Sequence, residues 1–422
     1  MKGENSLRII KWMLFVLFVI GLPCFSIGPS IPAFAQSTEP IKIGMLGNLT
    51  GSLAAYGYSH QKVAKAAIDK INREGGIAGR PVELFVEDDE TKPSVGALKF
   101  RKLVETNGVS FVLNSNHSGV NIACAPVAKE LKTLYFPCGS SAELSGKKGN
   151  RYVFHAVTNV RGNARGATKW AAANLGKKWA TIVVDYAWGQ SNEEEFKRYI
   201  SEFGGVVLTS IRVPLQTSNW LPYLKGKIPA EVEAVYFAAF GSDFLCFARD
   251  LHSVRPDVKK LGAVYSFGGL DPRKSGPQGE GTYCLTAYPT PLGGLNTSYN
   301  KKYREIIGVD EEGRELGTGK EFVLGYNWSV WESIFTLKLG IEKSGWKKGT
   351  DGPALIRALE GIHLKESLEF PQGDKYYRAE DHALVTGIYV EQISNQKIIV
   401  ASRIPKEDTL YTPEVDRTKE PF

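Results

Sequence analysis

The feature that most constrains the fold is a regular alternation between short apolar runs and longer amphipathic segments. The run 41–46 is bounded by turn residues, and apolar residues then recur at helical spacing over 59–74. Gly75 and Gly76 end this segment, as glycines commonly do at the carboxyl end of a helix. Strands that alternate with helices in this way predict a parallel sheet covered by helices on both faces.

The same alternation continues along the chain and fills two units of similar size. Further strands are expected at 82–87, 109–113, 133–137, 152–156, 180–185, 206–213, 234–239, 260–266 and 281–287. Further helices are expected at 93–107, 120–131, 161–175, 190–203, 220–227, 242–254, 298–307 and 321–343. A hairpin is expected over 388–403, with its turn at Ser394 and Asn395. The pattern predicts an α/β protein of two units, the first completed by the late helices.

The amino-terminal segment has the three-part layout of a secretory signal peptide. Lys2, Arg8 and Lys11 precede the apolar run 12–22, and residues 33–35 (Ala-Phe-Ala) form a small-x-small cleavage site. The apolar run is much shorter than the ~20 residues that a membrane-spanning helix needs. We therefore expect residues 1–35 to be removed and the product to be exported to the periplasm.

Two alternatives stay open for this segment: an uncleaved anchor helix, and lipid attachment at Cys24, which the preceding Pro23 disfavours. Cleavage after residue 35 would leave 387 of the 422 residues. It would remove three basic residues and Glu4, so the formal net charge of +7 would fall to +5. No later stretch is long and apolar enough to span a membrane.

Charge and motifs argue against nucleic acid as a partner and against several enzyme classes. A surplus of 52 Lys and Arg over 45 Asp and Glu is small for this length, whereas nucleic-acid binding usually needs a clustered basic face. There is no G-x-S-x-G or H-E-x-x-H motif, and the six histidines lack metal-ligand spacing. The segment 317–320 is no P-loop. We expect no cofactor, no metal and no catalysis, with an enzyme that uses a cleft between the units as the alternative.

Four cysteines follow the expected cleavage site: Cys124, Cys138, Cys246 and Cys284. An oxidising compartment permits pairing, and four cysteines allow three full pairings. There is no C-x-x-C motif, so neither a redox motif nor a zinc ribbon is supported. Disulfides and buried free thiols both remain possible, because cysteine is also a common small core residue.

Small hydroxyl and aromatic residues gather where the expected strands end. Ser118 follows the strand 109–113, and Ser140 and Ser141 follow 133–137. Ligands of open α/β sheets bind at the carboxyl ends of the strands, and a serine beside free N–H groups at a helix start suits a carboxylate. Singly, these residues could be turn or capping residues. Together they predict a site for a small molecule.

Several longer motifs point to one family. They are Leu49-Thr50-Gly51, Tyr56-Gly57, the run 69–80 (DKINREGGIAGR), the run 87–93 (EDDETKP), Ala125-Pro126-Val127-Ala128, Asp185-Tyr186-Ala187-Trp188-Gly189 and the run 377–382 (YRAEDH). From about residue 41 to residue 400, the chain resembles the leucine/isoleucine/valine-binding family of type I periplasmic binding proteins. These proteins are the substrate-binding receptors of branched-chain amino acid-type ABC transporters.

The resemblance implies two Rossmann-like lobes with parallel sheets, joined by a three-strand hinge. It places lobe 1 at 36–157 plus about 288–366, and lobe 2 at 158–287 plus about 367–422. It implies that an amino acid, or a related aromatic or aliphatic acid or amide, binds in the cleft and that hinge closure buries it. The implied partner is an ABC permease, with a membrane regulator as the alternative, and the implied state is a monomer without a cofactor.

The resemblance also suggests ligand-binding residues. Ser118, Ser140 and Ser141 fall where the family contacts the ligand's carboxylate and amino group. Tyr56 matches the aromatic residue of the first loop, and Trp188 and Phe240 stand where the second lobe usually offers tyrosine. His117 replaces a cysteine of the family's first-lobe disulfide, so that disulfide is not expected here.

The ligand class depends on an acidic group. Amino acid binders of this family hold the ammonium with a carboxylate at the end of a second-lobe strand, where this chain has Gly269. Asp271 could replace it only with a loop shift of about two residues. A buried ammonium without a partner charge is strongly disfavoured. If Asp271 does not reach the cleft, a neutral amide or an aromatic or aliphatic acid is favoured, and Trp188, Phe240, Phe267 and Tyr56 would suit its apolar body.

Overall fold

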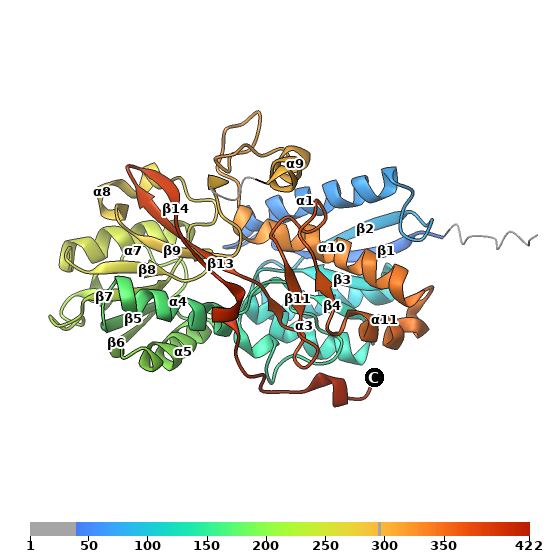
Figure 1. The fold of residues 1–422 in the computed structure, drawn as a ribbon, viewed down its shortest axis with the longest axis horizontal. Coiled ribbons are helices and arrows are strands. Elements are labelled where there is room, and N and C mark those ends of the chain that lie inside the picture. The colour runs from blue at the N-terminus through green and yellow to red at the C-terminus, as the bar shows by residue number, and fades with distance from the viewer. Residues whose placement is uncertain (1–38, 294–296) are drawn as a thin grey trace, which may run out of the picture. The chain divides into compact units, whose positions relative to one another are not determined.

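A computed structural model describes residues 39–293 and 297–422 (Figure 1). The expected signal peptide, 1–35, lies outside the described residues. These residues all belong to one compact unit. Within them, no helix combines the length and the apolar character that crossing a bilayer requires.

The first sheet has four parallel strands in the order β2-β1-β3-β4. They are β1 (Ile41–Gly47), β2 (Val82–Asp88), β3 (Phe111–Asn114) and β4 (Leu134–Phe136). Alternate residues of β3 join different hydrophobic clusters: Phe111 and Leu113 join one, and Val112 joins the other with Phe100 and Tyr135. Both faces of this sheet are therefore buried, as expected of a parallel sheet.

Helices from two distant parts of the chain cover the first sheet. The early ones are α1 (Ala54–Arg73), α2 (Pro93–Arg101), which continues as the π-helix η1 (Lys102–Thr106), and α3 (Ser118–Glu130). The late ones are α10 (Leu324–Ser344), which packs on α1 and β3, and α11 (Gly352–Leu359), which packs on α10. The short helix α9 (Ser298–Ile307) also contacts α1.

The second sheet has seven strands in the order β14-β13-β9-β8-β7-β5-β6. The parallel strands are β5 (Lys178–Val184), β6 (Val206–Val213), β7 (Ala234–Ala238), β8 (Lys259–Gly262) and β9 (Tyr283–Thr286). The hairpin of β13 (Ile388–Ser394) and β14 (Lys397–Ile404) adds two antiparallel strands beside β9. The helices of the second lobe are α4 (Val160–Asn174), α5 (Ala187–Glu202), α6 (Leu221–Leu224), α7 (Gly241–Val254) and α8 (Gly276–Gly279).

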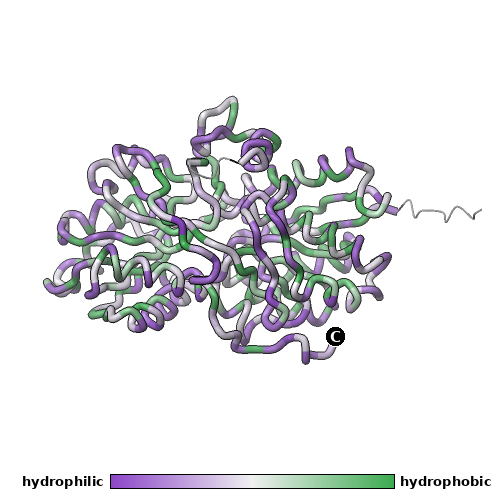
Figure 2. Tube along the Cα trace, in the orientation of Figure 1, coloured by the Kyte–Doolittle hydropathy of each residue, from purple (hydrophilic) through white to green (hydrophobic). Residues whose placement is uncertain are grey.

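Burial along the strands follows their place in the second sheet. Every residue of the central strand β7 is buried, whereas exposed and less exposed residues alternate along the edge strands β6 and β14. In Figure 2, which colours the trace by hydropathy, hydrophilic stretches are frequent on the outer helices and turns. The chain passes between the two sheets three times, after β4, after β9 and before β13. The expected fold class, two parallel-sheet lobes joined by three crossings, is confirmed.

Two expected strands differ in the structure. Residues 152–156 form only isolated bridges, Tyr135 with Val153 and His155 with Ala383. The strand expected at 260–266 ends at Gly262, and Tyr265 adopts a left-handed φ of 73°, which is incompatible with an extended strand. Residues 152–156 lie where the chain first passes from the first sheet to the second, whereas the segment after Gly262 belongs to the loop that joins β8 to β9 within the second sheet.

The last part of the chain is divided between the two sheets. A small antiparallel sheet of β10 (His363–Leu364), β11 (Lys375–Tyr377) and β12 (Leu384–Val385) lies before the hairpin. Tyr377 contacts Phe136 and Phe154, and His382 stacks on Phe154, so this segment packs beside β4. The predicted second-lobe range 367–422 pairs with the second sheet through β13 and β14, while 375–385 contacts the first lobe.

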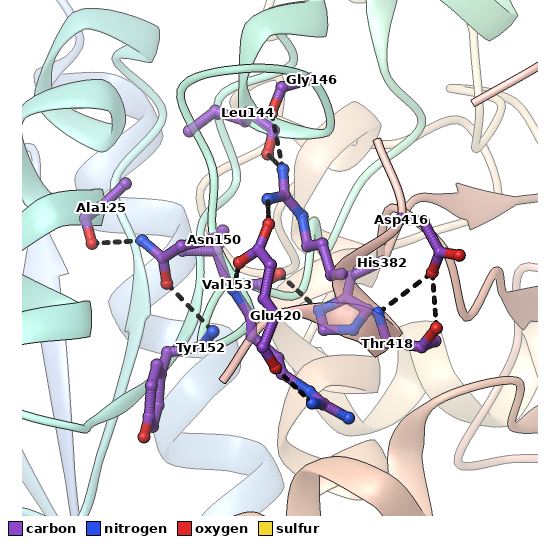
Figure 3. A network of polar contacts seen from close by, with 12 residues as sticks. Ala125, Leu144, Gly146, Asn150, Tyr152, Val153, His382, Asp416, Thr418 and Glu420 are labelled. Carbon is purple, nitrogen blue, oxygen red and sulfur yellow. Dashed lines mark hydrogen bonds and ion pairs between the residues drawn. The ribbon is translucent and has the colours of Figure 1, made fainter. Parts of the chain in front are cut away.

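The carboxyl-terminal tail also reaches the first lobe. The Arg417 side chain is 1% exposed, and its guanidinium donates to the Gly146 carbonyl at 2.6 Å and to the Leu144 carbonyl at 3.4 Å. Glu420 pairs with Arg417 and accepts a hydrogen bond from the Arg151 amide (Figure 3). The sequence pattern predicts no helix or strand in this tail beyond the hairpin.

Candidate functional site

A small cavity is enclosed by residues from both lobes, near the carboxyl ends of their strands. We call this group the aromatic box; its eight members are Leu53, Tyr56, Asn116, Tyr186, Trp188, Phe240, Tyr265 and Tyr326. The cavity measures about 20 Å³. That is room for about one water molecule and not for an organic ligand. A ligand can therefore enter only if the rings, or the lobes that carry them, move apart.

Three pairs of rings in the box meet edge to face, and one of them, Tyr56 with Phe240, joins the two lobes. The ring centroids of Tyr56, from α1, and Phe240, which precedes α7, lie 6.1 Å apart, with an interplanar angle of 85°. Phe240 in turn lies 5.7 Å from Trp188 at 73°. Tyr56 also contacts Tyr326 of α10 at 5.9 Å. Edge-to-face pairs at these distances are favourable aromatic contacts, so the rings hold one another in place.

The last residue of β3 and the first residue of the following loop form a strained pair that hydrogen bonds hold in place. Asn114 and Ser115 have φ values of 73° and 65°, which is uncommon for residues other than glycine. The Leu46 carbonyl accepts hydrogen bonds from the Asn114 side chain at 2.9 Å and from the Ser115 amide at 3.0 Å. Such strain persists only where surrounding contacts impose it, and it is concentrated at functional sites.

Asn116 follows this strained pair and is fixed through its backbone. Its amide donates to Asn48 Oδ1 at 2.7 Å, and Asn48 Nδ2 donates to the buried Asp89 carboxylate at 2.7 Å. Burial raises the pKa of Asp89 to about 6, and the hydrogen bonds from its neighbours oppose that rise. The network leaves the Asn116 side chain free to line the box.

Five buried polar atoms in or near the box have no hydrogen-bond partner among the described residues. They are Asn116 Oδ1, Asn116 Nδ2, Ser141 Oγ, Trp188 Nε1 and Tyr265 Oη. The side chains that carry them are almost fully buried, with Asn116 only 6% exposed. A buried polar group left without a partner costs about 1–3 kcal/mol, so native proteins seldom keep several together. Their presence around one cavity is the signature of a site that a ligand or water completes.

The three serines lie together at the amino-terminal end of α3. Ser118 Oγ accepts a hydrogen bond from the Ser141 amide at 3.3 Å, and Ser140 Oγ lies 3.2 Å from the Tyr326 hydroxyl. All three serines are fully buried. A side chain at Gly139 would meet Asn121 Oδ1 at 2.2 Å, so glycine is required for this close approach of the loop to α3.

A larger cavity of about 690 Å³ adjoins the box, and Tyr56 and Phe240 line both. Its charged lining residues are Asp243, Glu315, Lys320 and Glu321. Glu315 is neutralised by Lys62 at 2.7 Å. Burial raises the pKa of Asp243, whose Oδ2 accepts a hydrogen bond from the Gln216 amide. The outer cavity is therefore charged, whereas the box contains no ionisable acid or base other than tyrosine hydroxyls.

The structure does not bring Asp271 together with the other predicted site residues. Asp271 lines neither cavity; it caps the 3-10 helix η3 (Pro272–Ser275) and pairs with Arg273 at 2.8 Å. The Arg273 guanidinium holds the pKa of the Asp271 carboxyl below its usual value. Gly269 does line the outer cavity, so a carboxylate is missing where the family pattern expects one.

Three tyrosines and one asparagine of the box were not among the predicted site residues. Asn116 and Tyr186 each stand two residues before a predicted site residue, Ser118 and Trp188 respectively. Tyr265 was assigned to a strand, and Tyr326 to a long helix with no sign of a ligand contact. Only the packing of α10 against the first lobe places Tyr326 beside Tyr56 and Tyr265.

The described residues offer neither disulfides nor a metal-binding cluster. All four cysteines after the expected cleavage site are unpaired, and Cys124, Cys138 and Cys284 are buried. Of the two possibilities that the sequence left open, free thiols are the one found. Across residues 39–293 and 297–422, no group of three or more His, Cys, Asp or Glu side chains is placed to hold a metal ion.

Sequence comparison identifies related proteins over most of the chain. A family model described as "Periplasmic binding protein" matches residues 40–397. The Leu/Ile/Val-binding protein BraC3 of Rhizobium johnstonii is 26% identical over 322 residues, which cover 76% of this chain and 83% of that protein. The Leu/Ile/Val-binding protein homolog 4 of Brucella melitensis is 23% identical over 415 residues, covering 94% and 92%.

Solved structures share the fold at low sequence identity. A periplasmic binding protein from Burkholderia mallei has a TM-score of 0.77 at 18% identity, covering 90% of this chain and 99% of that one. An ABC transporter solute-binding protein from R. palustris in complex with benzoate has a TM-score of 0.74 at 18% identity, covering 87% and 96%. The branched-chain amino acid transporter substrate-binding protein LivJ from Streptococcus pneumoniae, in complex with isoleucine, has a TM-score of 0.71 at 18% identity, covering 87% and 99%.

Proposed function

Because the chain belongs to the periplasmic binding protein family, we propose that it is the extracytoplasmic receptor of an ABC importer, and that it captures a small solute in the aromatic box. The observation that carries the proposal is the set of unpartnered buried polar atoms around a box built from both lobes. A receptor that closes over its ligand needs such a site, because the ligand supplies the missing hydrogen bonds on closure.

Binding begins on the first lobe in this proposal. Ser118, Ser140 and Ser141 at the start of α3 receive the polar end of the ligand, and Tyr56 lies against its body. The second lobe then brings Trp188 and Phe240 over the ligand by hinge motion. Because the box has only about 20 Å³ of free space, the ligand must enter while the lobes are apart. The same small volume means that closure of the lobes excludes solvent from the box.

The ligand is a small amino acid, or a related acid or amide, with an apolar body. The aromatic rings suit an apolar body, and the charged residues lie in the outer cavity. Relatives named for binding leucine, isoleucine and valine, and similar folds holding isoleucine or benzoate, support this range. The Arg273 partner of Asp271 weakens the case for an ammonium bound by that carboxylate.

The remaining parts of the proposal follow from the family. The protein acts in the periplasm after removal of residues 1–35, works as a monomer, delivers its ligand to a membrane permease and catalyses no reaction. Light scattering on the mature chain checks the monomer, and a stable dimer would contradict it.

A ligand screen tests the receptor function directly. The mature protein is screened by thermal shift against amino acids, aromatic and aliphatic acids, and short amides, because a ligand that binds the native state raises the melting temperature. Ser118→Ala and Ser141→Ala should each weaken the binding of a hit by about 1–3 kcal/mol, through loss of a hydrogen bond to the ligand's polar end. Unchanged affinity in both variants would refute the serine site, and turnover of the hit would reveal an enzyme.

A further inference from the structure

The side chain of Asn116 carries chemical information about the ligand. It lines the aromatic box, is 6% exposed, and has both Nδ2 and Oδ1 buried without a partner among residues 39–293 and 297–422. The amide of Asn116 could be turned by 180°, with its nitrogen and oxygen exchanged, and both atoms would still lack a partner among the described residues. The box therefore presents one hydrogen-bond donor and one acceptor side by side.

The donor and acceptor of the Asn116 amide are best matched by a ligand group that also carries a donor and an acceptor side by side, with the donor facing Oδ1 and the acceptor facing Nδ2. A primary carboxamide satisfies both atoms at once, since its N–H donates to Asn116 Oδ1 and its carbonyl accepts from Nδ2. A carboxylate has acceptors only, so it can pair with Nδ2 but sets its second oxygen against Oδ1. An ammonium has donors only and leaves Nδ2 unsatisfied.

The surroundings of Asn116 favour a neutral partner. The eight residues of the box include no carboxylate, lysine, arginine or histidine. The nearby His117 is occupied: its Nδ1 accepts from the Val120 amide, and burial lowers its pKa to about 4, so it carries no charge at neutral pH. An ion in the box would therefore lose its hydration without gaining a counter-charge.

Two further unpartnered groups line the same cavity, Trp188 Nε1 and the Tyr265 hydroxyl. Trp188 Nε1 is buried without an acceptor among the described residues and comes from the second lobe, whereas Asn116 comes from the first. An amide carbonyl oxygen has two lone pairs, so it can accept from both Asn116 Nδ2 and Trp188 Nε1. Such a group would bridge the lobes only when they are closed.

We propose that the polar end of the ligand is a neutral primary carboxamide, which pairs with the Asn116 side chain and turns its second N–H to the serine hydroxyls, and that Asn116 selects amides against the corresponding acids. This rests on the proposed function, because it assigns the chemistry of the same box. The strained loop at Asn114 and Ser115 and the Asn48–Asp89 network hold Asn116 in place as a positioned selectivity group.

Matched pairs of probes test the selection. Isothermal calorimetry on the mature protein compares benzamide with benzoate and isobutyramide with isobutyrate, with leucine as the amino acid probe. We expect each amide to bind at least about tenfold more tightly than its acid, since the unsatisfied Asn116 oxygen costs about 1.4 kcal/mol or more.

Two variants test the role of Asn116. Asn116→Leu, of similar size and without polar atoms, should cost at least about tenfold in amide affinity and narrow the gap between amide and acid. Asn116→Asp should lose benzamide and gain benzamidine, whose two parallel N–H donors match a carboxylate. Asn219→Asp is the matched control, because Asn219 is exposed and its side chain caps the Leu221 amide, a role that aspartate keeps.

The outcomes separate the selection from the receptor function. Tighter binding of benzoate or leucine than of the amides overturns the amide assignment and leaves a receptor. Amide binding that is equal in wild type and Asn116→Leu overturns the role of Asn116. Failure of amides, acids and leucine alike overturns both proposals. Circular dichroism checks folding: unpartnered atoms predict that ligand-free Asn116→Leu melts no lower than wild type, and a large drop in melting temperature would indicate a structural role instead.

Discussion

The imidazole of His117 stacks on the phenol ring of Tyr186, with the ring centroids 4.9 Å apart and the planes 18° from parallel. His117 is the N-cap of α3 in the first lobe, and Tyr186 is the N-cap of α5 in the second. One face-to-face contact thus joins the starts of two helices that flank the aromatic box. The relative position of the lobes and the capping of α3 depend on the same imidazole.

The stability contributed by His117 should depend on pH. Burial lowers the pKa of the folded imidazole from 6.5 to about 4, so the native state holds it neutral while the unfolded chain takes up a proton below pH 6.5. Stability is therefore full above pH 6.5 and is lost as the pH falls toward 4, by about 2 kcal/mol at pH 5. His117→Asn keeps a good N-cap residue and removes the titration.

Chemical denaturation of wild type and His117→Asn at pH 7.5 and pH 5.0 measures this effect. Other titrating groups act on both proteins and cancel in the difference. We expect the advantage of wild type in the free energy of unfolding to shrink or reverse at pH 5.0. A difference that is the same at both pH values would show that the native state takes up the His117 proton as readily as the unfolded chain does.

Trp188→Phe separates ring packing from hydrogen bonding in the box. Trp188 is 5% exposed and packs on Phe240, while its Nε1 has no partner among the described residues. Phenylalanine keeps an aromatic ring and removes the N–H, so we expect a loss of stability of at most about 1–2 kcal/mol and a loss of ligand affinity of about 1 kcal/mol or more. Thermal melts measure the stability and calorimetry measures the ligand affinity. If the variant does not fold, Trp188 is a core residue rather than a ligand-binding residue.

Asp271→Asn should leave ligand binding unchanged. The Asp271 carboxylate caps η3 and pairs with Arg273, which is largely exposed, and it lines neither cavity. Such a surface ion pair is worth little, so we expect a loss of stability of about 1 kcal/mol or less. Calorimetry with the best ligand of the screen tests this expectation. A tenfold or larger loss of affinity would show that Asp271 takes part in ligand binding.

Arg417→Met tests the contribution of the carboxyl-terminal tail. Methionine keeps much of the aliphatic stem but removes the guanidinium from the carbonyls of Leu144 and Gly146 and from the carboxylate of Glu420, which then keeps only the Arg151 amide. We expect the free energy of unfolding to fall by about 2–3 kcal/mol, with ligand affinity unchanged. Lys419→Met, at a side chain 82% exposed, is the control. Equal urea midpoints for the two variants would contradict a stabilising tail.

Most of the α/β alternation was predictable because periodicity is local. The expected strand 41–46 is β1, and the expected hairpin 388–403 is β13 and β14. The expected helix 59–74 begins earlier, at Ala54, because Tyr56-Gly57-Tyr58 looks like a turn in sequence. In the structure Gly57 is helical, and a side chain there would meet the Asn48 carbonyl at 2.2 Å.

The sequence by itself determined the two-lobed α/β architecture and the segments at whose strand ends a ligand site would form, since hydrophobic spacing and turn residues act over a few positions. Only the tertiary structure decided which side chains of those segments meet. Tyr326 lines the box because α10 packs on the first lobe. Asp271 lies outside the box, where it caps η3 and pairs with Arg273. Whether Asn116 finds a partner depends on groups distant in the chain, and no local pattern encodes that.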